Sequence, residues 1–252
     1  MAMELDLLAF GPHPDDVELF CSGTLIKLGL KGYSTGIASL TRGELGTRGS
    51  PEIRSKEFEQ AAEILGLSYH QILDMPDGDI TPDRSSKIEI IRIIRDLRPK
   101  IVLAPYWEDR HPDHYHTSRL VQVAAFLAGL EKIATDQEAH RPRRIMYYPC
   151  WFEFEPSFVV DVTECHQRKM DAIRAYQSQF HHQNKENYGH QETLISQPEF
   201  LENIVIRAKR YGSSIGTAYG EAFLVRESLR VDDPIDFFGP ECSNTLPLGA
   251  RG

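Results

Sequence analysis

Residues 5–16 read Leu-Asp-Leu-Leu-Ala-Phe-Gly-Pro-His-Pro-Asp-Asp, and this stretch decides the fold class. The apolar run from Leu5 to Phe10 predicts a buried strand, and the Gly-Pro pair behind it predicts a turn. In open α/β sheets, binding sites form outside the carboxyl ends of the strands. We therefore expect His13, Asp15 and Asp16 at the position where chemistry usually takes place in such a sheet.

Predicted strands alternate with predicted helices along the rest of the chain. Further strands are expected at 33–40, 69–73, 100–104, 144–148 and 158–162. Helices are expected at 23–31, from Ser50-Pro51 to Gly66, at 85–97, up to about 130, from Thr163 to about 178 and at 198–210. Such alternation predicts an α/β fold: one domain over 1–252, with a Rossmann-like, mostly parallel sheet and helices on both faces.

Three later segments are expected to be irregular. The polar stretch from about 180 to 197, which contains His181 and His182, is expected to be a solvated surface loop. The glycine-rich segment 212–220 is expected to lie close to the site, and the tail 233–252 to be irregular.

The composition limits the kinds of partner. The 252 residues carry a formal charge of −9 and a pI of about 5.6, which disfavours broad nucleic-acid binding. The four cysteines form no CxxC pair, which favours a reducing compartment. We find neither a signal peptide nor an apolar run of the roughly 18–20 residues that a membrane helix needs. The expectation is a cytoplasmic protein that binds neither nucleic acid nor membrane.

The first polar constellation is His13, Asp15 and Asp16. Imidazole and carboxylate are expected ligands of a catalytic zinc, and a hydrolytic zinc also needs a neighbouring base for its water. The flanking prolines restrict the backbone, so the two aspartates can point in different directions, one to the metal and one to the water. The alternative is that the Asp-Asp pair merely caps the following helix.

The second constellation, Arg110-His111-Pro112-Asp113-His114, follows the predicted strand 100–104. One of its histidines can complete a three-ligand zinc site with His13 and Asp16. The other histidine and the aspartate form a natural donor pair. Helix capping is again the alternative. Two matching motifs at two strand ends favour the metal site over coincidence.

Other common site motifs are missing from the sequence. It contains no GxxxxGK[ST] loop, no GxGxxG after the first strand and no GxSxG elbow. Nucleotide binding of the P-loop or Rossmann type and serine-hydrolase chemistry are therefore disfavoured.

The sequence resembles the LmbE-like, or PIG-L-type, zinc deacetylases. The matching pieces are AFGPHPDDVEL, LTRGELGTRGSPEIRSKE, LAPYWEDRHPDH, AYQSQF and AYGEAF, which span roughly residues 5–225 in the same order. Within that family it is most similar to the bacillithiol-biosynthesis deacetylases, which act on N-acetylglucosaminyl malate. The resemblance implies an LmbE-like fold and a hydrolase that removes the acetyl group from a small-molecule N-acetylglucosamine conjugate.

The resemblance also implies a cofactor and an assembly. His13, Asp16 and His114 would hold one Zn²⁺ per chain, with other divalent metals such as Fe²⁺ as alternatives. Relatives form homo-oligomers, commonly trimer-based hexamers, so a homo-oligomer is expected here.

Catalytic and substrate roles follow from the same resemblance. Asp15 would be the general base, and His111 would be the electrophile or acid, oriented by Asp113. The residues expected to bind substrate are Arg54, Glu44 and Arg110.

Two positions depart from the family pattern. Cys21-Ser22 stands where small, glycine-like residues are usual, with little expected effect. Phe200 stands where relatives carry a tyrosine that can reach over the oxyanion, so that hydroxyl is missing here.

Three other functions remain as alternatives: deacetylation of another N-acetylglucosamine conjugate or a chitooligosaccharide, a two-metal phosphoesterase, and a sugar-conjugate binding protein without turnover.

Overall fold

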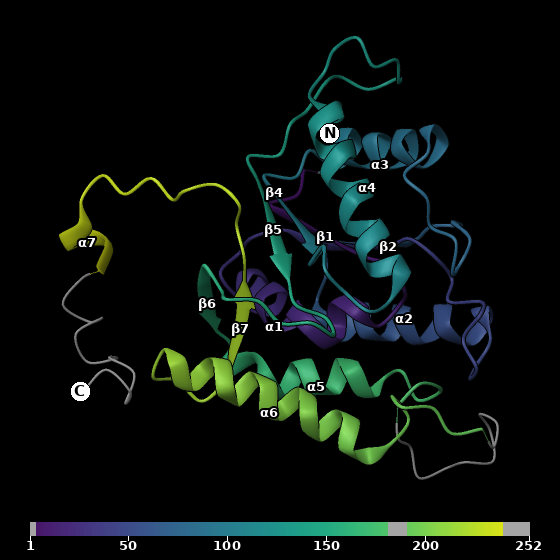
Figure 1. Cartoon of the computed structure of the whole chain (residues 1–252), viewed down its shortest axis with the longest axis vertical. Coiled ribbons are helices and arrows are strands. Elements are labelled where there is room, and N and C mark those ends of the chain that lie inside the picture. Colours follow the sequence, from purple (N-terminus) through teal and green to yellow (C-terminus); the bar gives the residue numbers. More distant parts are fainter. Residues whose placement is uncertain (1–3, 181–190, 239–252) are drawn as a thin grey trace.

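The computed structural model describes residues 4–180 and 191–238, and its centre is a parallel five-stranded sheet (Figure 1). The strand order is β3-β2-β1-β4-β5. The strands are β1 (Leu7–Gly11), β2 (Thr35–Ser39), β3 (Tyr69–Ile72), β4 (Ile101–Pro105) and β5 (Arg144–Tyr148). A second, antiparallel pair joins β6 (Phe158–Asp161) to β7 (Gly220–Phe223). The predicted α/β class with a mostly parallel sheet is confirmed.

Helices cover both faces of the sheet, as predicted (Figure 1). One apolar cluster includes side chains of α1 (Asp16–Leu30), α2 (Pro51–Leu65) and α5 (His166–Arg174), and the other includes α3 (Arg84–Leu97) and α4 (Pro112–Ala128). Strand β1 supplies both clusters, because alternate side chains of a strand point to opposite faces. Leu7 and Ala9 belong to the first cluster, and Leu8 and Phe10 to the second.

The order of the strands places the site. β1 pairs with β2 on one side and with β4 on the other, so the direction of winding reverses between them. Ligands in open α/β sheets bind at such a switch point, outside the carboxyl ends of the strands. The two polar constellations follow β1 and β4, and the fold therefore brings them to one crevice.

Helix α2 shows the local signals that the sequence predicted. Ser50 caps its start by accepting a hydrogen bond from the Ile53 N–H (3.3 Å), and Pro51 occupies the first helical position. The helix ends at Gly66, whose φ of 70° is one that glycine adopts without strain.

Helix α1 was predicted too short. It begins at Asp16 rather than at residue 23, directly after the first constellation. Every residue from Asp16 to Ile26 is buried, including polar Glu18 and Ser22. A helix that is buried on all sides does not alternate between an apolar and a polar face. The pattern of apolar residues therefore could not predict where this helix begins.

The helix predicted from Thr163 to about 178 was also wrong in its bounds. Residues Thr163–Cys165 form a single 3₁₀ turn (η1), and α5 ends at Arg174. Thr163 does not cap α5, because its Oγ1 donates to the Asp161 carboxylate (2.6 Å).

Helix α6 (Pro198–Ser214) continues past the predicted residue 210, and β7 was not predicted. Residues 212–220, expected near the site, contain the turn between these elements and do not line the catalytic cavity described below. The tail predicted as irregular from 233 includes a short helix, α7 (Pro234–Phe238). His181, His182, Cys242 and the tail from 239 lie outside the described residues.

Two further observations concern the described chain. None of its helices combines the length and the apolar character that crossing a bilayer requires. Cys21, Cys150 and Cys165 are buried free thiols.

Candidate active site

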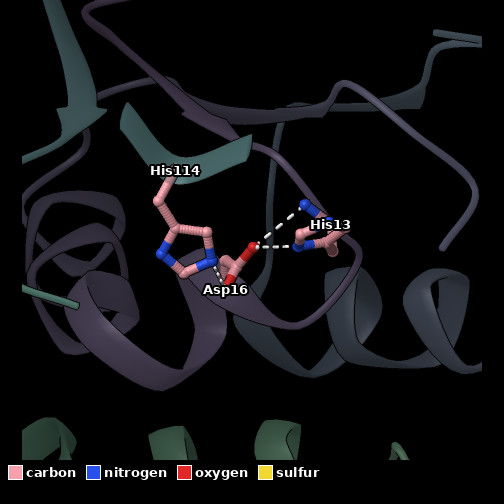
Figure 2. A group of neighbouring side chains, drawn as sticks. All are labelled: His13, Asp16 and His114. Carbon is pink, nitrogen blue, oxygen red and sulfur yellow. Dashed lines mark hydrogen bonds and ion pairs between the residues drawn. The ribbon is translucent and has the colours of Figure 1, made fainter. Parts of the chain in front are cut away.

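Three predicted ligands, His13, Asp16 and His114, lie together at the ends of β1 and β4 (Figure 2). The Asp16 carboxylate lies between the two imidazoles, with Oδ2 3.1 Å from His13 Nδ1 and Oδ1 3.3 Å from His114 Nε2. One donor atom from each of the three residues lies within 4.8 Å of the others. A single divalent ion fits such a set of two nitrogens and an oxygen.

The far side of each imidazole faces carboxylates. His13 Nε2 lies 3.1 Å from both Asp77 Oδ1 and Asp113 Oδ2, and His114 Nδ1 lies 3.4 Å from Asp109 Oδ1. Metal-binding histidines usually present their second nitrogen to a carboxylate, which fixes the ring and its tautomer. The surroundings of both rings are therefore those of metal ligands.

The charges of the cluster also favour a cation. Burial opposes a proton on His13 or His114, yet their pKa values are raised well above the ordinary value by hydrogen bonds and charges from neighbouring aspartates. Asp16 experiences the converse, because His114 and His13 lower its pKa despite burial. A bound divalent ion would replace these protons as the source of positive charge.

Asp15 lies beside the cluster. It occupies the N-cap position of α1, but its side chain makes no capping hydrogen bond. The carboxylate instead accepts from Arg54 Nη2 at 2.8 Å, and burial raises the Asp15 pKa to about 7. Its φ of 119° is rare for a residue with a side chain, and backbone strain of this kind concentrates at functional sites.

His111 occupies the N-cap of α4, and its Nδ1 accepts a hydrogen bond from the Asp113 backbone N–H (3.2 Å). Burial lowers the His111 pKa, and the charges of His13 and His114 lower it further. The neutral ring therefore carries its proton on Nε2. The Asp113 carboxylate, predicted to orient His111, instead accepts from His13 Nε2 and from the Gly78 N–H (2.7 Å). Asp113 thus contacts His111 through its backbone N–H, and its role in orienting that ring stays a prediction.

A cavity of about 340 Å³ opens over these groups. The predicted residues that line it are His13, Asp15, Asp16, Arg54, His111 and His114.

Three other residues singled out from the sequence stand outside the cavity wall. Glu44 accepts from the Asp77 N–H (2.8 Å), and the Arg110 guanidinium stacks 3.7 Å from the centre of the Trp151 ring. Phe200, on α6, stacks on Phe180 with ring centres 5.8 Å apart.

Sequence reasoning missed three residues of the site. Asp77 and Asp109 face the two imidazoles, and Trp151 lines the cavity. Arg48, an arginine close to the motifs in the sequence, lines the cavity as well. Asp109 follows β4 and directly precedes the second constellation, so the rule that sites lie at strand ends could have found it.

Comparisons with known proteins agree with this geometry. Residues 8–125, which include both His-Pro-Asp motifs, match the family described as PIG-L: GlcNAc-PI de-N-acetylase. A diacetylchitobiose deacetylase of Thermococcus kodakarensis is 32% identical over 189 residues, which cover 69% of this chain and 70% of that protein. The chain belongs to the PIG-L family. The resemblance drawn from the motifs is thereby confirmed.

Two further comparisons cover more of the chain. A Bacillus anthracis protein named "Probable N-acetyl-alpha-D-glucosaminyl L-malate deacetylase 2" is 29% identical over 201 residues, 71% of this chain and 84% of that protein. The crystal structure of a conserved protein from Thermus thermophilus superimposes with a TM-score of 0.81 at 38% identity, covering 90% of this chain and 98% of that one. The LmbE-like fold is confirmed, and the expected amidohydrolase is confirmed at the level of the family.

Proposed function

We propose that this PIG-L protein hydrolyses the N-acetyl amide of an N-acetylglucosamine conjugate, with one divalent ion, preferably zinc, held by His13, Asp16 and His114. One observation carries the proposal. The Asp15 carboxylate lies outside the ligand set, in the same cavity and held by Arg54. A site that only binds a metal needs no such carboxylate, whereas hydrolysis needs a base beside the attacking water.

Asp15 accepts the proton of the attacking water in the proposed mechanism. Its hydrogen bond from Arg54 fixes the carboxylate before substrate arrives, which reduces the reorganisation needed in the transition state. The same carboxyl group then returns the proton to the leaving amine. The bound ion supplies Lewis acidity toward the acetyl carbonyl and the water.

His111 acts on the other reacting atom. Because Nδ1 is occupied by the Asp113 N–H, the Nε2 proton remains available to donate to the acetyl oxygen as negative charge develops there. The Phe200 ring cannot share this role, since it has no hydroxyl and packs on Phe180.

For the substrate, we favour N-acetylglucosaminyl malate. The B. anthracis relative carries that substrate in its name, and the cavity contains the buried Arg48, a suitable partner for a carboxylate on the aglycone. The T. kodakarensis relative is named for the uncharged diacetylchitobiose, which is the competing substrate.

The arrangement of donors favours one ion over the two of a phosphoesterase. In the described chain, the other two groups with metal-ligand spacing share His13 or His114 with the first. Overlapping groups cannot hold two ions at the roughly 3.5–4 Å separation of two-metal sites without sharing these rings. A cytoplasmic location and the lack of nucleic-acid and membrane partners remain predictions from composition.

The decisive variant is Asp15→Asn, assayed by acetate release from N-acetylglucosaminyl malate, diacetylchitobiose and an N-acetylglucosaminyl inositol. We expect the wild type to release acetate and the variant to lose at least about 10²-fold in kcat, the lower range for a general base. Elemental analysis should find about one metal ion per chain in both proteins.

Asp74→Asn is the matched control, because Asp74 is an exposed aspartate that lies outside the cavity and pairs with surface Arg42 (2.8 Å). It should retain wild-type turnover. Near-normal turnover by Asp15→Asn would refute the assigned base, and failure of the wild type on all three substrates would refute the proposed reaction.

A further inference from the structure

The last described segment, residues 229–238, projects from the body of the molecule, and we call it the C-terminal arm. Figure 1 shows it leaving β7 and running away from the sheet, with α7 apart from the other helices. Its apolar side chains are exposed to an unusual degree: 80% for Ile235, 56% for Phe237 and 61% for Phe238. Monomeric proteins rarely leave such a group of large apolar side chains in water.

The arm has a structure of its own and an acidic character. Asp233 caps α7 by accepting from the Ile235 N–H at 2.8 Å. In the described chain, the hydrogen bonds of residues 229–238 join arm residues to one another. The arm carries three aspartates (Asp232, Asp233 and Asp236) and one arginine (Arg230). A partner surface should therefore be apolar and basic.

Such a surface exists where β5 forms the edge of the parallel sheet beside α4. A hollow of about 490 Å³ is lined there by Arg119, Arg141, Arg143, Arg144 and Arg226, and we call it the arginine pocket. Phe126, Ile145 and Tyr147 supply apolar surface. Among its lining residues in the described chain, Glu227 is the one carboxylate, and it faces Arg144 at 3.4 Å. A basic hollow is unexpected on a protein with a charge of −9.

We propose that the C-terminal arm of one copy docks in the arginine pocket of a second copy. The rings of Phe237 and Phe238 would cover the apolar surface around Phe126, which is itself 58% exposed. Asp232 and Asp236 would face the guanidinium groups, where carboxylates gain charge-assisted hydrogen bonds.

A second copy fits better than the arm's own chain. Arg226, just before the arm begins, already lines the pocket. Figure 1 shows the arm leading away from β5, the strand that carries Arg144, Ile145 and Tyr147 of the pocket. A two-fold axis beside the pocket would therefore let two copies exchange arms reciprocally. Each arm would begin beside the pocket of its own chain, and its helix α7 would lie in the pocket of the other copy. The expected homo-oligomer thus acquires a specific contact.

Charge reversal tests the contact in the full-length protein. The arm variant is Asp232→Arg/Asp236→Arg, and the pocket variant is Arg119→Glu/Arg143→Glu. All four side chains are exposed, and Asp233 is kept so that α7 retains its cap. We expect the wild type to sediment as an oligomer and each variant to sediment as a smaller, folded species with an unchanged circular dichroism spectrum.

Mixing the two variants is the critical step. Within each variant alone, the arm and the pocket carry charge of the same sign and repel each other. In the mixture, the arm of one variant meets a pocket of opposite charge on the other variant, so the wild-type mass should return. A monomeric wild type, variants that keep the wild-type mass, or a mixture that fails to reassociate would each overturn the proposal.

The control is Arg92→Glu/Arg174→Glu, which makes the same charge change on exposed arginines of α3 and α5 outside the pocket. It should keep the wild-type mass. Dissociation of this control would show that overall charge governs association, and the proposal would fall.

Discussion

Arg48 is held in the cavity wall by the segment that follows α5. Its Nε donates to the Ser178 carbonyl (2.9 Å), and Gln179 Nε2 donates back to the Arg48 carbonyl (2.8 Å). Glu57 anchors the segment by accepting from the Ser178 N–H (2.7 Å) and Oγ (2.6 Å). A guanidinium fixed in this way loses little side-chain entropy when it binds a carboxylate, so it can discriminate between charged and neutral aglycones.

Arg48→Gln should therefore separate the two competing substrates. A buried charge-assisted hydrogen bond contributes about 1.5–3 kcal/mol, so KM for N-acetylglucosaminyl malate should rise roughly tenfold to a hundredfold. KM for diacetylchitobiose should change by less than about threefold, since that ligand offers no charge to lose. Steady-state kinetics on both substrates measure the difference.

Arg42→Gln provides the comparison, because Arg42 is a half-exposed arginine of the same loop and lies outside the cavity. It should leave both KM values unchanged. An equal rise in KM for both substrates in Arg48→Gln would mean that Arg48 supports the cavity structurally and does not contact the aglycone.

Single residues were predictable where a motif and a strand end coincided. His13, Asp16 and His114 belong to two similar motifs, and the structure brings them together. Asp77 carries no such signal, because a lone aspartate in a Pro-Asp-Gly turn is usually a turn residue. Its contact with His13 joins positions far apart in the chain, and only the folded structure reveals it.

At the scale of elements, the loop between β2 and α2 closes tightly on Arg54. Gly43 has a φ of 64°, and a Cβ placed on it would lie 2.7 Å from Arg54 Cζ. An alanine there would both strain the backbone and push the guanidinium away from Asp15. The loop thus requires glycine in order to keep the Arg54–Asp15 contact.

Gly43→Ala should reduce kcat by roughly tenfold to a hundredfold, the cost of displacing a catalytic contact by about an ångström. It should also lower the free energy of unfolding by about 1–2 kcal/mol, the cost of a left-handed alanine. Acetate release and urea denaturation measure the two effects.

Gly29→Ala is the contrasting change, since Gly29 lies in α1 and a Cβ there meets nothing within 4 Å. It should raise the free energy of unfolding by about 0.5–1 kcal/mol and leave kcat unchanged. Full activity in Gly43→Ala would show that Arg54 tolerates displacement, contrary to its proposed role.

Elements were predictable where their ends carry chemical signals. Helix α2 begins at Ser50-Pro51 and ends at Gly66, as expected. The predicted α1 was too short, because its first turns contain Asp16, Glu18 and Ser22, polar residues that are buried in the folded protein. The end of α5 was missed because Ala175 to Phe180 is compatible with a helix. Its actual turn is stabilised by Glu57 and Arg48, which are distant in sequence.

At the scale of the whole molecule, distant elements meet around His166, which lies at the start of α5. Its ring stacks on Tyr219 with centres 3.6 Å apart, and its Nδ1 is buried without a hydrogen-bond partner in the described chain. Burial lowers the His166 pKa to about 4, and the charge of Lys169 contributes in the same direction, whereas Glu221 opposes it. The folded protein thus holds this histidine neutral where an unfolded chain would protonate it.

The sign of the resulting pH dependence follows from linkage. Above pH 6.5 the ring is neutral in both states and has no effect on stability. Between pH 6.5 and about 4 the unfolded chain binds a proton that the folded protein does not, so stability falls as the pH falls. The slope from one proton is about 1.4 kcal/mol per pH unit, and it vanishes below the folded pKa.

His166→Phe isolates this contribution, because phenylalanine keeps a ring against Tyr219 but cannot titrate. Urea denaturation of both proteins between pH 7.5 and 4 should show a wild-type stability that declines more steeply, with the difference between the proteins shifting toward the variant as the pH falls. Other acid-sensitive groups, including the ligand cluster, are common to both proteins and cancel in that difference. A difference independent of pH would show that His166 titrates alike in the folded and unfolded states, and that its burial does not exclude the proton.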